Sequence, residues 1–234
     1  MRFLNTIDKD KHKGKMAFVL GSGPSLRFLN PEILKPHVTI AVNSAIMKAS
    51  ESDYYFTCDF GMTVWHSWLT LQNLKCQIRL FNVDVGFRHL ETLTKQDTFE
   101  GIDEHRVAYF DMKESLDMDS YPLIQGSTST HAAVHFAHFM GCSPIVLLGC
   151  DNKYVDDKYH YYDFHGQPHD DYRKDSYRDF KPRINDFNKY LDGHEIVWWE
   201  LSRWNPGINI IDCSLGTLDM FPQPSLASTL FKYA

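Results

Sequence analysis

The chain has 234 residues, of which 43% are hydrophobic, and its formal net charge is −6. A chain of this size and composition can bury the core of one domain and still provide a lid or small subdomain. The negative charge and the lack of a long basic run argue against a nucleic-acid groove, and no apolar stretch is long enough to span a bilayer.

Five cysteines are scattered along the chain without CxxC spacing. This pattern favours reduced thiols over a disulfide scaffold or a zinc site. The first fifteen residues include the charged run 8–15, which is too polar for a secretory signal. We therefore expect a cytoplasmic protein with a charged N-terminal extension over residues 1–15 and one domain over residues 16–234. The sequence is compatible with a homo-oligomer as well as with a monomer.

Short apolar runs indicate strands, and several of them lack polar alternation, as strands buried on both faces do. The expected strands are Met16–Leu20, Val38–Val42, Tyr54–Thr57, Gln77–Phe81, Val107–Phe110, Ile145–Leu148, Glu195–Trp199 and Asn209–Ile211. The expected helices between them are Pro31–Leu34, Ala45–Ala49, Met62–Leu74, Ser129–Met140, Tyr177–Leu191 and Pro224–Phe231. This alternation predicts an α/β fold, a single Rossmann-like, doubly wound domain with a mainly parallel sheet and a lid segment.

The first strand runs into the turn Gly21-Ser22-Gly23-Pro24-Ser25. Glycines allow a sharp turn and a close approach to a ligand, and N–H groups at a following helix start favour an anion. The spacing differs from the dinucleotide fingerprint, because no third glycine follows where helix and strand would pack. A Gly-Pro turn is also ordinary punctuation after a strand.

Asn43 ends the second expected strand, where nicotinamide-dinucleotide enzymes usually carry a carboxylate, so NAD binding is not expected. Its amide can donate and accept hydrogen bonds to a nucleotide, or it can cap the next helix. Asp59 closes the third strand and can bind a ligand or Mg²⁺, or serve as a cap.

Two further segments follow the same pattern. Thr128 and Ser129 open an apolar helix, where hydroxyl and N–H groups suit a phosphate and are also ordinary caps. Gly149 and Asp151 follow the most hydrophobic strand, which makes them candidates for a ligand site.

Residues 152–177 are rich in Tyr, His and Asp and poor in aliphatic residues, which predicts a lid over the carboxyl edge of the sheet. Histidine is the usual general base near neutral pH, and tyrosine hydroxyls can stabilise a leaving phosphate. The candidate catalytic residues are His165, His160, His169, Tyr154 and Tyr162. The histidine spacing does not favour a metal site, and each of them can also be a solvated loop residue.

These motifs resemble a superfamily that contains bacterial CMP-sialic-acid-dependent sialyltransferases, archaeal 6-hydroxymethylpterin diphosphokinases and motility accessory factors. The resemblance rests on the segment 20–26, on Asn43, on the pair Thr128 and Ser129, on the segment 144–151, and on 213–222. It implies a nucleotide-binding transferase whose matched turn, asparagine, hydroxyl pair and Asp151 surround the donor. In the sialyltransferases a lid histidine acts as base and tyrosines bind the departing phosphate.

The preferred interpretation is a sialyltransferase-like glycosyltransferase that transfers a sugar from a nucleotide-sugar donor to a glycan hydroxyl and requires no metal cofactor. His165 is the preferred base. The first alternative is a diphosphokinase of the 6-hydroxymethylpterin type, which uses Mg-ATP and a small-molecule acceptor, with Asp59 and Asp151 near the Mg²⁺. The second alternative is a nucleotide-binding module without catalysis.

Overall fold

The computed structural model describes residues 8–58, 78–82, 107–161 and 184–233. Seven of its strands form one sheet in the order β5-β4-β3-β2-β1-β8-β9, and every neighbouring pair is parallel. The strands are β1 (Ala17–Leu20), β2 (Val38–Val42), β3 (Tyr54–Thr57), β4 (Ile78–Asn82), β5 (Val107–Phe110), β8 (Ile145–Leu148) and β9 (Ile210–Asp212). The expected mainly parallel α/β sheet is confirmed.

Burial explains why these runs form central strands. All residues of β1, β2, β3 and β8 are buried, so their apolar side chains fill both faces of the sheet. In β1, Ala17 pairs with Val38 of β2 and with Ile145 of β8, which fixes the register at the centre of the sheet.

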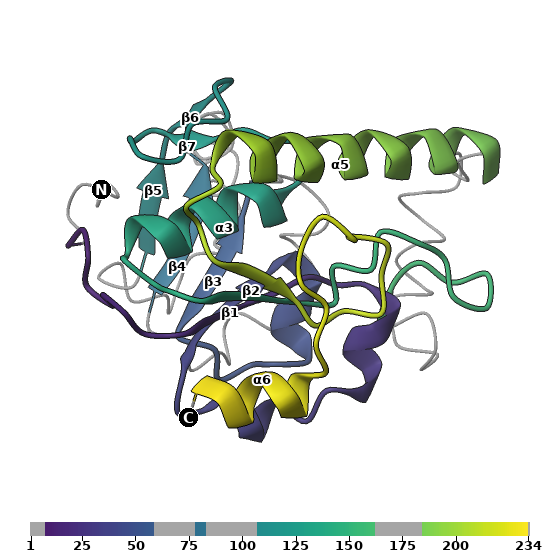
Figure 1. Cartoon of the computed structure of the whole chain (residues 1–234), viewed down its shortest axis with the longest axis horizontal. Helices are drawn as coiled ribbons and strands as arrows, with labels where there is room; N and C mark the ends of the chain where they lie inside the picture. Colours follow the sequence, from purple (N-terminus) through teal and green to yellow (C-terminus); the bar gives the residue numbers. More distant parts are fainter. Residues whose placement is uncertain (1–7, 59–77, 83–106, 162–183, 234) are drawn as a thin grey trace, which may run out of the picture.

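Helices cover both faces of the sheet (Figure 1). On one face lie α3 (Ser129–Phe139) and α5 (Ile184–Trp204), whose Phe136, Trp198 and Leu201 belong to the same buried cluster as Val19 and Ile40. The other face carries α6 and three short 3₁₀ helices, packed on a cluster that includes Phe18 and Leu20. These elements are η2 (Pro24–Phe28), η3 (Pro31–Leu34), η4 (Asn43–Met47) and α6 (Leu226–Tyr233).

The chain reverses its direction across the sheet at β1. The strands that follow β1 add in turn on one side, from β2 to β5, whereas β8 and β9 add on the other side. In open parallel sheets, ligands bind in the crevice outside the carboxyl ends of the strands where this reversal occurs. The ends of β1 and β8 are therefore the place in this fold to look for a site.

One expected strand is wrong. Glu195–Trp199 lies inside α5, and the helix expected to end at Leu191 continues to Trp204. Leu191, His194, Trp198 and Leu201 are buried at spacings of three and four residues, which is the helical period. Their apolar neighbours Ile196 and Trp199 are exposed, so an aliphatic and aromatic run that favours a strand locally forms a helix against α3.

Smaller differences concern the short elements. The expected helices at 31–34 and 45–49 are the 3₁₀ helices η3 and η4, and the last helix begins two residues later than expected. A two-stranded sheet of β6 (Met112–Lys113) and β7 (Leu123–Ile124) was not expected. The expected helix Met62–Leu74 lies outside the described residues.

Residues of the charged N-terminal run are hydrogen-bonded to the end of α3 and the residues after it. The backbone N–H groups of Asp10, His12 and Gly14 donate to the carbonyl groups of Phe139, Met140 and Gly141. Among the described residues, no helix combines the length and the apolar character needed to cross a bilayer.

Candidate functional site

The candidate site lies along the carboxyl ends of five neighbouring strands. In sheet order these strands are β9, β8, β1, β2 and β3. Each is followed at once by polar residues or glycines that the structure describes. These residues are Ser214 after β9, Gly149 and Asp151 after β8, Gly21 to Ser25 after β1, Asn43 after β2 and Cys58 after β3.

The turns after β1 and β8 pack backbone against backbone. The N–H group of Gly23 donates to the carbonyl oxygen of Gly149 at 2.7 Å. A Cβ atom on Gly23 would lie 2.6 Å from the same oxygen, and Gly149 itself has a φ of +67°. Side chains at either position would push the turns apart, so these two glycines are needed to bring the turns together. The sequence analysis expected a close approach of this turn to a ligand; the structure shows that Gly23 closely approaches the second turn of the protein, and the ligand contact stays a prediction.

Asp151 joins these two turns to a third. Its side chain is 1% exposed, its Oδ2 accepts the N–H of Ser25 at 2.7 Å, and its Oδ1 accepts the N–H of Leu215 at 3.0 Å. Both oxygens are thus engaged by backbone donors from the turns after β1 and β9. The N–H of Ser25, expected to receive an anion, donates to a carboxylate of the protein itself. The expectation that Asp151 contacts a nucleotide stays a prediction.

Replacing Asp151 by Ala should lower the free energy of unfolding by about 2–3 kcal/mol, because two backbone donors lose a charged acceptor. Urea unfolding followed by circular dichroism measures this change. Asp219, an exposed aspartate of the C-terminal segment, supplies the matched control: Asp219→Ala should change the free energy by less than about 0.5 kcal/mol. Equal losses of stability in the two variants would show that the hydrogen bonds of Asp151 to Ser25 and Leu215 do not stabilise the fold.

The turn after β9 adds a second aspartate that the sequence analysis did not select. Asp212 is fully buried, and its Oδ1 accepts the N–H of Ser214 at 2.9 Å. The Oγ of Ser214 in turn accepts the N–H of Cys150 at 2.9 Å. Burial raises the pKa of Asp212 to about 6, and the nearby charge of Asp151 acts in the same direction. An acid at the end of a strand was the signal used for Asp59 and Asp151, and the same rule applied to the last strand would have found Asp212.

Tyr161 holds the turns after β1 and β2 from the side of the expected lid. Its N–H donates to the carbonyl of Ser22 at 3.0 Å, and its hydroxyl donates to the carbonyl of Ser44 at 2.9 Å. Burial raises the pKa of the Tyr161 hydroxyl, which therefore stays protonated as a donor. Ser22 and Asn43 are half-buried at the two strand ends that Tyr161 connects. Asn43 has a φ of +50°, a left-handed conformation in which asparagine is enriched.

At the start of α3, where the sequence predicts an anion site beside Thr128 and Ser129, two backbone amides have a partner within the protein. The N–H groups of Ser127 and Thr128 both donate to Nδ1 of His131, at 3.1 and 3.2 Å. His131 is fully buried against Trp198, and burial lowers its pKa to about 3, so the ring is a neutral cap that accepts through Nδ1. The Oγ of Ser129 accepts the N–H of Cys58 at 3.0 Å, at the end of β3. The Ser127 and Thr128 amides and the Ser129 hydroxyl are thus engaged within the protein, and contact of Thr128 and Ser129 with a nucleotide stays a prediction.

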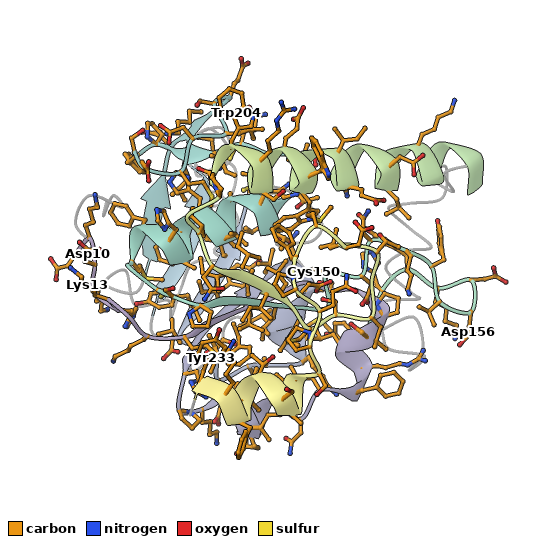
Figure 2. All side chains as sticks on the ribbon, viewed as in Figure 1. Asp10, Lys13, Cys150, Asp156, Trp204 and Tyr233 are labelled. Atoms are coloured by element: carbon orange, nitrogen blue, oxygen red, sulfur yellow. The ribbon has the colours of Figure 1, made fainter. Side chains whose placement is uncertain are left out.

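Part of the expected lid is described. Residues 152–161 form a loop with a short antiparallel bridge between Val155 and Lys158, and Asp156 lies at its outer end (Figure 2). The rings of Tyr154 and Tyr159 lie 5.8 Å apart, and that of His160 lies 4.6 Å from Tyr159. Asp59, Tyr162, His165 and His169 lie outside the described residues, so the preferred base has no position here.

The described side chains do not make a metal centre by themselves. Within residues 8–58, 78–82, 107–161 and 184–233, no group of three or more His, Cys, Asp or Glu side chains is arranged to hold a metal ion. Asp151, one of the two expected neighbours of Mg²⁺, has both oxygens hydrogen-bonded to the backbone. The site thus combines two kinds of group along the strand ends. The buried carboxylates of Asp151 and Asp212 follow β8 and β9, and the half-buried Ser22 and Asn43 follow β1 and β2, near the tyrosine-rich loop.

Comparison with known proteins gives one match. A family model described as 6-hydroxymethylpterin diphosphokinase MptE-like matches residues 2–157. No curated protein and no solved structure matches the chain. The matched part contains β1, β2, β3 and β8 with the turns that follow them, and it ends before α5 and β9.

Proposed function

Because this chain belongs to the 6-hydroxymethylpterin diphosphokinase MptE-like family, we propose that it transfers diphosphate from a magnesium-bound nucleoside triphosphate to a pterin-like alcohol. In such a reaction the alcohol oxygen forms a bond to the β-phosphorus. The bond between that phosphorus and the oxygen bridging it to the α-phosphate breaks, and a nucleoside monophosphate leaves. The hydroxyl proton passes to a base or to solvent. Mg²⁺ enters with the nucleotide, as part of the substrate.

The observation that carries this proposal is the joining of the β1 and β8 turns at the reversal point of the sheet. Gly23 and Gly149 meet there through a 2.7 Å hydrogen bond, and both lie inside the segment that the family model matches. Nucleotides bind at this place in parallel α/β sheets. We place the triphosphate over the β1 turn, with Ser22 and Asn43 in contact with it.

The buried carboxylates favour a nucleotide that arrives with a cation. Asp151 accepts a hydrogen bond from the β1 turn, and its charge contributes to the raised pKa of the buried Asp212. A bare phosphate over these two carboxylates would be repelled, whereas bound Mg²⁺ neutralises part of the phosphate charge. This argument favours a Mg-nucleotide over a metal-free sugar donor.

A sialyltransferase-like glycosyltransferase is the second candidate, and the position of the tyrosine-rich loop supports it. Tyr161 binds the carbonyls of Ser22 and Ser44, which brings His160 and Tyr159 to the same strand ends. In this case Tyr154 would stabilise a leaving phosphate, and a histidine of residues 152–177 would deprotonate the glycan hydroxyl.

A thermal-shift panel separates the two candidates. ATP with Mg²⁺ should raise the melting temperature by several degrees at concentrations well above Kd, and EDTA should abolish the shift. CMP and CMP-sialic acid should have no effect. Release of AMP from ATP only when 6-hydroxymethylpterin is present then tests the reaction itself. A shift with CMP-sialic acid that resists EDTA would instead support the glycosyltransferase.

A further inference from the structure

The turn after β9 belongs to the candidate site but lies outside the part of the chain that the family model matches. Asp212 and Ser214 follow residue 157, where the family match ends, by more than fifty positions. The backbone nevertheless returns to the β8 turn, because β9 pairs in parallel with β8 and Leu147 lies opposite Asp212. The last strand of the sheet therefore brings a third turn to the reversal point.

A continuous set of hydrogen bonds runs from this third turn to the β1 turn. Oδ1 of Asp212 accepts the N–H of Ser214, and Oγ of Ser214 accepts the N–H of Cys150, both at 2.9 Å. Cys150 is bonded covalently to Asp151, whose Oδ2 accepts the N–H of Ser25 at 2.7 Å. Figure 2 shows Cys150 near the middle of the molecule, where these turns meet. Two steps of the path join different strand ends: Ser214 to Cys150 joins β9 to β8, and Asp151 to Ser25 joins β8 to β1.

From this path we infer that Asp212 and Ser214 are positioning residues, which hold the β8 turn and thereby set the conformation of the β1 turn. The Oγ of Ser214 holds the Cys150 amide through a hydrogen bond, so the backbone of the adjacent Asp151 keeps one orientation. The carboxylate of Asp151 therefore keeps its hydrogen bond to the N–H of Ser25. The effect on a nucleotide rests on the proposed function, because it requires that the nucleotide binds over the β1 turn.

The environment of Asp212 argues against a role in packing alone. The Oδ2 atom of Asp212 is buried and has no hydrogen-bond partner among the described residues. A buried carboxylate with one unsatisfied oxygen costs stability, and an apolar residue at this place would avoid the cost. Natural proteins keep such costs mainly at functional sites.

The test compares Ser214→Ala with Ser214→Thr, which keeps the hydroxyl, and with Ser228→Ala, an exposed serine in α6. Amide hydrogen exchange measured by NMR should show about tenfold faster exchange at Cys150 and also at Ser25 in Ser214→Ala. In Ser214→Thr the exchange rates of both amides should lie within about threefold of the wild-type rates. Ser228→Ala should change neither exchange rate. Faster exchange at Cys150 with an unchanged Ser25 would overturn the inference, since Ser214 would then act only locally.

The acceptor role of Asp212 is tested by a second pair of variants. Asp212→Asn keeps an oxygen that can accept the Ser214 amide, so the Ser25 amide should stay protected from hydrogen exchange. Asp212→Ala removes this acceptor, so the Ser25 amide should exchange faster. Equal loss of protection in both variants would show that the charge of Asp212 matters and not its position as an acceptor. That outcome would overturn the assignment.

Nucleotide binding provides the functional arm. The Kd of ATP with Mg²⁺ is measured by calorimetry at a temperature where every variant is folded. It should rise about tenfold in Ser214→Ala and return to near the wild-type value in Ser214→Thr. An unchanged Kd in Ser214→Ala would overturn the inference. If the wild type binds no nucleotide, the proposed function fails, while the exchange at Ser25 still decides the positioning role.

Discussion

Replacing Gly149 by Ala should lower the free energy of unfolding by about 3 kcal/mol or more, and so reduce Tm by about 10 °C. Two costs add at this position. An L residue at the observed φ of +67° is strained by roughly 1–2 kcal/mol. The new Cβ would also overlap the carbonyl oxygen of Gly21, a backbone atom that can move only with the whole β1 turn. Differential scanning calorimetry measures the change.

The same substitution at Gly193 is the matched control for Gly149. Gly193 lies inside α5 and a Cβ there would meet nothing within 4 Å. Gly193→Ala should therefore raise the free energy of unfolding, by up to about 1 kcal/mol, because alanine has the higher helix propensity. The free energy of unfolding should therefore fall in Gly149→Ala and rise in Gly193→Ala. A Gly149→Ala variant as stable as the wild type would show that the two turns do not need their close packing.

Proton uptake by His131 and His135 on unfolding should lower the free energy of unfolding by about 4 kcal/mol between pH 7 and pH 5. Burial lowers the pKa of His131 and of His135 from 6.5 to about 3. A histidine with a lowered folded-state pKa stabilises the fold above its unfolded pKa of 6.5, and this stability is lost as the pH falls below that value. From these values each histidine contributes about 2 kcal/mol over this range, which together is a large part of a typical domain stability. Urea unfolding at a series of pH values measures the loss.

His135 allows the source of this pH dependence to be isolated. Its Nδ1 accepts the N–H of Ile124 at 2.9 Å, and the side-chain oxygen of an asparagine can replace this acceptor. His135→Asn should be less stable at pH 7, but between pH 7 and pH 5 it should lose about 2 kcal/mol less of its free energy of unfolding than the wild type. An unchanged slope in His135→Asn would exclude buried His135 as a cause of acid lability.

The sequence predicted the central sheet well because its strands are short, apolar on both faces and bounded by turn residues. The expected bounds at Val38–Val42, Tyr54–Thr57 and Ile145–Leu148 are those of the structure. The run Glu195–Trp199 shows the limit of this reasoning. Its β-branched and aromatic residues favour a strand locally, and only the packing of Trp198 on His131 and Phe221 reveals why it is helical.

The family match within residues 2–157 supports the pterin diphosphokinase part of the resemblance that the sequence motifs indicated. The motifs could not show which groups of the site are already engaged. Asp151, the Ser25 amide and the amides before α3 all lie at the expected strand ends, yet each has a partner within the protein. Those partners are 126 residues away for Ser25 but only three and four residues away for the α3 amides.

The sequence by itself determined that a glycine-rich turn and an acid follow two buried strands, because apolar runs and turn residues are local properties of the chain. The order of the strands, which places β1 beside β8 and β9, was decided by tertiary packing. That order brings Gly23 to Gly149, Asp151 to Ser25, and Ser214 to Cys150. Contacts of this kind join residues far apart in the chain, and their formation depends on the burial of both faces of the sheet, which no single segment encodes.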